Sequence, residues 1–204
     1  DAKTLKSAFP PYFMKEFRVH GAPPVKVAVL GLTNPGIAIW DKAYVQGKLT
    51  FPGLEEQAAK WVPKLRSMGA DVVVVSAHSG ASGTSSYGDQ LPYVENSAAL
   101  VAQQVPGIDA ILVGHAHLEI PELKVTNTAT GKTVVLSEPL AYAERLSVFD
   151  FGLVFEKGRW HVESVAASVR NANSVADDPR ITRLLKDEQE LVDSRNLDLR
   201  ELLV

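Results

Sequence analysis

Short apolar runs and helical periodicity alternate through the first half of the chain. Residues 25–30, 71–77 and 108–113 are rich in Val, Ile, Leu and Ala and are bounded by Pro, Gly or Asp, a pattern typical of buried strands. Residues 54–68 place apolar side chains three or four positions apart, which predicts a helix, and a second helix is expected at residues 95–104, ending at Pro106-Gly107. The order of strand, helix, strand, helix, strand predicts an α/β fold with parallel pairing.

The second half of the chain changes to short strand-like segments. Gly131-Lys132 and Lys157-Gly158-Arg159 suit hairpin turns, so an antiparallel β segment is expected here. An edge strand is expected at residues 12–19. A polar helix is expected over residues 177–204, because Asp178 and Pro179 suit a helix start. The strand-like segments are residues 124–127, 133–136, 146–155 and 160–170.

Composition excludes several classes of protein and site. The net charge of −3 gives no basic field for a nucleic acid polymer. No apolar run approaches the roughly 20 residues that a membrane span requires. Cysteine is absent, which removes disulfides, thiolate metal sites and cysteine nucleophiles. A hydrophobic content of 46% with 22% charged residues is ordinary for a globular domain.

Histidines follow two of the predicted strands at the point where each strand ends. His78 comes directly after residues 71–77, and His115 and His117 follow residues 108–113 in the sequence Gly-His-Ala-His. Ligands of open α/β sheets bind beyond the carboxyl ends of the strands, where these rings would meet. Neutral imidazole is a common ligand of zinc, manganese and iron. The pattern therefore predicts one metal site made by His78, His115 and His117.

Other polar residues have weaker settings. Thr33 and Asn34 follow a strand at the same predicted edge and are candidates for substrate binding, although a capped turn explains them as well. Glu95 and Asn96 open a predicted helix, where they could cap it or touch substrate. Asp109 precedes its strand and so lies at the wrong end for the site.

Two of these motifs are similar to those of a known family. His78-Ser-Gly and Gly114-His-Ala-His117 resemble the last two metal-binding motifs of the calcineurin-like metallophosphoesterases. The stretches at residues 107–117 and 29–35 resemble the branch of 5′-nucleotidases and 2′,3′-cyclic-nucleotide 2′-phosphodiesterases. The resemblance implies an αββα sandwich and a metal-dependent hydrolase acting on nucleotides or other phosphate esters, in a protein exported to the periplasm or the outside.

The resemblance also implies a two-metal centre. By motif position, His78 and His115 would bind the second metal and His117 the first; Zn, Mn, Fe, Mg and Ca are not distinguished. In such centres the metals polarise the phosphoryl group and activate water.

The earlier motifs of that family are missing from the chain. Asp-x-His and Asn-His do not occur, and Gly88-Asp89 follows His78, which is the wrong order. The chain is therefore interpreted as half of the αββα sandwich, with a partial catalytic domain at residues 1–176 and a linker helix at 177–204. Catalytic residues are expected in the missing amino-terminal half. At most one metal is expected here, because three neutral rings cannot offset the repulsion between two close dications.

Two other functions remain open. A half-domain with an uncovered sheet could be a non-catalytic module that pairs with the missing half or with another chain. A complete single-zinc hydrolase is the third alternative, but it requires a carboxylate general base, for which no candidate stands out.

Overall fold

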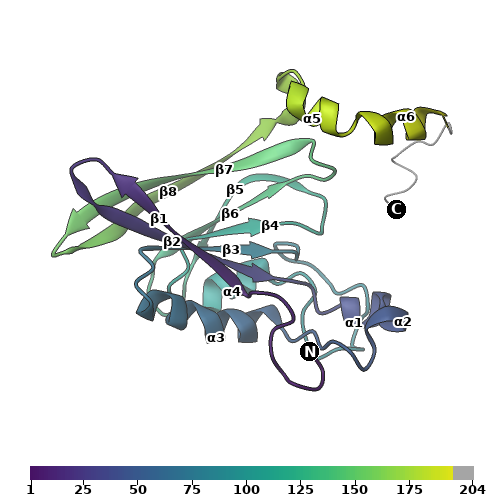
Figure 1. The fold of residues 1–204 in the computed structure, drawn as a ribbon. Helices are drawn as coiled ribbons and strands as arrows, with labels where there is room; N and C mark the ends of the chain where they lie inside the picture. The colour runs from purple at the N-terminus through teal and green to yellow at the C-terminus, as the bar shows by residue number, and fades with distance from the viewer. Residues whose placement is uncertain (195–204) are drawn as a thin grey trace. The chain divides into compact units, whose positions relative to one another are not determined.

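The computed structural model describes residues 1–194 (Figure 1). These residues fall into two units, the first ending at Asn171 and the second beginning at Ala172. The first unit contains a six-stranded sheet in the order β1-β2-β3-β4-β6-β5. Strands β2, β3, β4 and β6 are parallel, and the edge strands β1 and β5 are antiparallel to their neighbours. The strands are β1 (Tyr12–Val19), β2 (Ala22–Leu32), β3 (Val72–Ala77), β4 (Ala110–Val113), β5 (Glu119–Thr126) and β6 (Thr133–Pro139). The predicted mixed α/β fold is confirmed.

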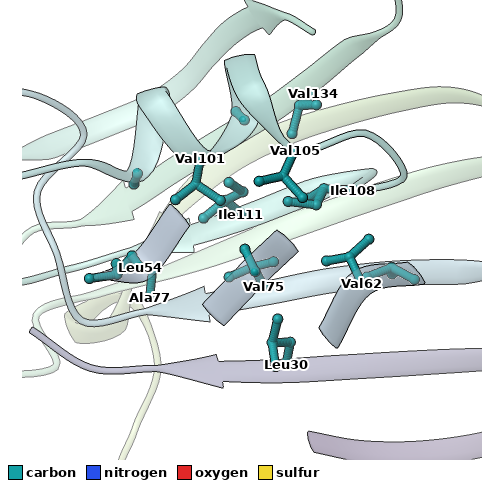
Figure 2. Packing of buried hydrophobic residues seen from close by; sticks show 14 of the residues in the cluster. Leu30, Leu54, Val62, Val75, Ala77, Val101, Val105, Ile108, Ile111 and Val134 are labelled. Atoms are coloured by element: carbon teal, nitrogen blue, oxygen red, sulfur yellow. The ribbon is translucent and has the colours of Figure 1, made fainter. Parts of the chain in front are cut away.

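Helices α3 (Leu54–Ser67) and α4 (Ala98–Gln104) cover one face of this sheet. The buried residues of α3 recur every three or four positions, which gives the helix one apolar side. Gly69 follows the helix with a φ of +89°, a conformation that suits glycine and ends the helix. Figure 2 shows the core between helices and sheet, where Val62 and Val101 pack with Val75 and Ile111.

Two short helices were not predicted. They are α1 (Ile37–Trp40) and α2 (Lys42–Val45), which lie between β2 and α3. Neither contains a buried residue, so no apolar periodicity marks them.

The hairpin of β7 (Arg145–Glu156) and β8 (Arg159–Asn171) forms a separate two-stranded sheet. Lys157 and Gly158 both have positive φ, as the predicted tight turn requires. The hairpin contacts the sheet face opposite the helices. Leu136 of β6 points into the core under the helices, so the next residue, Ser137, points to the other face. Its Oγ lies 2.7 Å from Oγ of Ser147 in β7.

That opposite face is only partly covered. Val27 and Val29 of β2 and Val74 of β3 alternate with core residues and stay half-buried. An apolar strip of the sheet therefore remains accessible within the first unit.

The second unit contains the 3-10 helix η1 (Ala172–Ser174), α5 (Pro179–Leu184) and α6 (Lys186–Ser194). Asp178 caps α5, since its side chain accepts a hydrogen bond from the backbone N–H of Arg180 at 2.8 Å. The helical start predicted here is confirmed, but the expected single helix is divided at Leu185, where α5 ends and after which α6 begins. Residues 195–204 of the expected helix lie outside the described residues, and its role as a linker stays a prediction. Among residues 1–194, no helix is long and apolar enough to cross a membrane.

Arg66 at the end of α3 joins the starts of two strands. Its guanidinium donates to the carbonyls of Gly107, Ala70 and Asp71 and lies 2.6 Å from Oδ2 of Asp109. Arg66→Met is expected to lower the free energy of unfolding by about 2–3 kcal/mol, because it leaves a mostly buried carboxylate and three carbonyls without their donor. Urea denaturation measures the change.

The matched control is Glu16→Gln, which breaks the exposed pair between Glu16 and Lys26. It is expected to change stability by less than about 0.5 kcal/mol. Equal effects of the two substitutions would show that the Arg66 cluster does not stabilise the fold.

Candidate metal centre

The parallel strands β3 and β4 bring two of the predicted ligands together. His78 follows β3 and His115 follows β4, and neighbouring parallel strands end at the same edge of the sheet. The two rings lie edge to face with their centroids 5.3 Å apart. Gly114 lies beside this pair, and a Cβ there would be in ordinary van der Waals contact with Nδ1 of His78, at 3.7 Å.

His117 does not pack against the other two histidine rings in the way that they pack against each other. Its ring packs edge to face against Tyr142, with centroids 5.4 Å apart. Within residues 1–194, no three His, Cys, Asp or Glu side chains gather closely enough to hold a metal ion. The structure therefore pairs His78 with His115, and metal binding by all three histidines stays a prediction.

The loop after β4 has an unusual backbone. His115 has a φ of 74° and His117 a φ of 56°, a region that L residues with side chains seldom adopt. Such residues cost about 1–3 kcal/mol each and gather at functional sites. Gly114 N–H donates to the carbonyl of Ser79 at 3.4 Å, which ties this loop to the one that carries His78.

Burial affects the protonation of His78. It lowers the pKa of the ring, and the neighbouring rings of His115 and His117 lower it further. A lowered pKa favours the neutral ring, which is the form that binds metals.

Glu95 was expected to cap a helix or to touch substrate, and in the structure its side chain contacts the ring of His115. Its Oε1 lies 2.6 Å from Nε2 of His115, and its Oε2 accepts a hydrogen bond from the backbone N–H of Ser86. Burial alone would raise the pKa of Glu95, but the hydrogen bonds from His115 and Ser86 outweigh it and lower the pKa. Glu95 does not cap α4, whose N-cap residue is Ser97.

The predicted substrate-binding residues have different surroundings. Asn34 is fully buried; its Nδ2 donates to the carbonyl of Glu95 at 3.1 Å, and its Oδ1 accepts from Gly36 N–H at 2.9 Å. These bonds fix the loop, and contact of Asn34 with substrate stays a prediction. Thr33 is exposed and lines an open cleft of about 700 Å³. The same cleft is lined by His78 and Trp61.

Glu138 at the end of β6 is a second buried carboxylate that the sequence did not single out. It has no exposed surface, and burial raises its pKa. Its Oε1 accepts from the backbone N–H of Leu118 at 3.3 Å, whereas Oε2 has no partner within the described part of the chain. It lies at the same edge of the sheet as the two histidine-bearing loops because β6 pairs with β4.

The donor atoms suit a metal ion in part. Two adjacent imidazole rings match the preference of zinc, manganese and iron for nitrogen ligands. Four or more ligands are usual, so the pair His78 and His115 could supply only a portion of a coordination shell.

Two known proteins that are similar in sequence to this chain share one name. The chain is 35% identical over 211 residues to the 2′,3′-cyclic-nucleotide 2′-phosphodiesterase/3′-nucleotidase of Salmonella typhimurium, an alignment that covers 93% of this chain and 31% of that protein. It is 34% identical to the protein of the same name from Yersinia enterocolitica over 83% of this chain and 27% of that protein. The chain thus spans about a third of the length of these relatives.

A solved structure shares the fold. The calcineurin-like phosphoesterase YfkN from Bacillus subtilis superposes with a TM-score of 0.77 at 26% identity, over 91% of this chain and 58% of that one. No protein-family model matches the sequence.

Proposed function

This chain belongs to the calcineurin-like phosphoesterases and is a homologue of the 2′,3′-cyclic-nucleotide 2′-phosphodiesterase/3′-nucleotidases over part of their length. From this premise we propose that it forms part of a metal-dependent hydrolase of nucleotide phosphoesters. The observation that carries the proposal is the pairing of His78 and His115 at the ends of two neighbouring parallel strands.

The residues of the site have separate tasks in this proposal. His78 and His115 would hold one divalent metal between their neighbouring rings. When bound, the metal supplies Lewis acidity toward the phosphoryl group. The cleft beside His78 would receive the nucleotide, with Thr33 offering a hydroxyl and Trp61 an apolar surface for a base.

The site requires further groups for catalysis. Two imidazoles leave most coordination positions of a metal to other ligands, and His117 faces Tyr142. The ligands of a second metal, a bridging carboxylate and the catalytic residues would come from the part of the family's domain that carries the earlier motifs. The isolated chain is therefore proposed to have little activity. Export to the periplasm or the outside remains part of the proposal.

One observation favours a second candidate, a half-domain that associates with a partner chain. The half-buried strip of Val27, Val29 and Val74 is apolar and lies on the sheet face away from the helices. A partner or a further segment of the same protein would bury it. Light scattering separates the two proposals, because a stable monomer in solution would contradict the association.

Hydrolysis of 2′,3′-cyclic AMP with added Mn²⁺ tests the first proposal. The chain alone is expected to be nearly inactive, and an extended protein, in which the chain is joined to a segment carrying the family's earlier metal-binding motifs, is expected to be active and inhibited by EDTA. A control with His78→Ala and His115→Ala in the extended protein is expected to be inactive. Undiminished hydrolysis by that control would overturn the proposal.

A further inference from the structure

The buried carboxylate of Glu95 lies behind His115, and neither the sequence motifs nor the proposed reaction uses it. We infer that Glu95 is a positioning residue that fixes His115 in one tautomer, with Nε2 carrying the hydrogen and Nδ1 open to a cation. The inference rests on the proposed metal site and assigns one of its two rings a defined ligand atom.

The hydrogen-bond chemistry determines the tautomer. Oε1 of Glu95 lies 2.6 Å from Nε2 of His115. An ionised carboxylate only accepts hydrogen bonds, so Nε2 must donate, and in the neutral ring Nδ1 then has a free lone pair. Metal-ligating histidines commonly donate their other ring N–H to a carboxylate in this way.

The carboxylate is itself held in place. Its side chain is 6% exposed, and its second oxygen accepts from the backbone N–H of Ser86. The backbone carbonyl of Glu95 accepts from Nδ2 of Asn34 and, at 2.7 Å, from Oγ of Ser79. Ser79 directly follows His78. Glu95 therefore joins the loops after β2, β3 and β4, through its bonds to Asn34, Ser79 and His115.

The plane of the His115 ring is fixed from another side. Trp40 stacks on the ring, with centroids 5.3 Å apart and an angle of 24° between the planes. The stack restrains the tilt of the ring, and the carboxylate of Glu95 sets its direction and the position of its hydrogen.

The substitution Glu95→Gln separates positioning from packing. A glutamine has nearly the same shape but only one oxygen, for which Ser86 N–H and His115 compete. The backbone N–H of Ser86 can only donate, so the amide oxygen turns to Ser86 and the amide NH₂ faces His115. Nε2 must then accept, and the hydrogen moves to Nδ1, where it blocks the ligand atom.

Nitrogen-15 NMR of the imidazole rings, on metal-free protein at mildly alkaline pH, tests the inference. The unmodified protein is expected to show the Nε2–H tautomer at His115, and Glu95→Gln the Nδ1–H tautomer. Calorimetric titration with Mn²⁺ alone is expected to show a loss of affinity of about 10–100-fold in Glu95→Gln.

Ser85→Ala is the matched control. It removes the hydroxyl that accepts from the backbone N–H of Glu95 at 3.1 Å and leaves the carboxylate in place. The tautomer and the Mn²⁺ affinity are expected to be unchanged in this variant, whereas a merely structural role of the loop would make both substitutions act alike.

The outcomes separate this inference from the proposed function. An Nδ1–H tautomer of His115 in the unmodified protein overturns the positioning role, and this measurement does not depend on whether the variant folds. The same tautomer of His115 in the unmodified protein and in Glu95→Gln also overturns it. A tautomer that inverts as expected in a protein that binds no Mn²⁺ supports the positioning role and contradicts the metal site.

Discussion

Replacing His78 and His115 together by alanine is expected to lower the affinity of the protein for Mn²⁺ by more than about 100-fold, to the level of nonspecific binding. The two rings are neighbours, with centroids 5.3 Å apart, and no three His, Asp or Glu side chains elsewhere in residues 1–194 gather to replace them. Removing both rings therefore removes the proposed nitrogen ligands of the metal. Calorimetric titration of the metal-free protein with Mn²⁺ measures the loss.

The control for this variant is His20→Ala, which makes the same substitution at an exposed position in the turn between β1 and β2. It is expected to leave Mn²⁺ affinity unchanged. Circular dichroism confirms that the double variant is folded. Retention of the unmodified protein's affinity by a folded double variant would exclude these two rings as ligands.

Ile111→Ala is expected to lower the free energy of unfolding by about 4 kcal/mol. Ile111 is fully buried in β4, the strand that precedes the loop of His115, and it packs in the core with Val101 of α4 (Figure 2). Alanine removes three carbon atoms and leaves a cavity between sheet and helices. Denaturation in urea, monitored by tryptophan fluorescence, measures the change.

Two further variants calibrate this result. Ile111→Val removes a single methylene from the same position and is expected to cost about 1 kcal/mol. Ile181→Ala removes the same atoms from an α5 side chain that is 53% exposed, and it is expected to cost less than about 0.5 kcal/mol. A loss in Ile111→Ala as small as that in Ile181→Ala would contradict the core described for β4.

The sheet could be predicted from the sequence because its central strands are uniformly apolar. The strands predicted at residues 71–77 and 108–113 contain β3 and β4, and their parallel pairing followed from the helix predicted between them. Residues 12–19 form the predicted edge strand β1. The strand at residues 124–127 was placed correctly but begins earlier, at Glu119, because an exposed edge strand has little apolar signal in its first residues.

The close pairing of His78 and His115 could also be predicted, since both follow parallel strands that end at one edge. The orientation of His117 could not, because it depends on the positive φ of two residues in the loop and on Tyr142, which is distant in sequence.

Glu95 shows why the rest of the site was missed. An acidic residue just before a helix usually caps it, and no spacing in the sequence links position 95 to position 115. The contact arises from the path of residues 80–97, which Ser79 and Asn34 hold through the carbonyl of Glu95. Only the folded loop brings this carboxylate to the ring.

Anomalous diffraction from crystals soaked in Mn²⁺ tests the central claim most directly. A manganese peak is expected within bonding distance of a ring nitrogen of His78 and of Nδ1 of His115, with Nε2 of His115 still hydrogen-bonded to Glu95. A manganese peak at other residues only, or bound to His115 through Nε2 with Glu95 displaced, would contradict it.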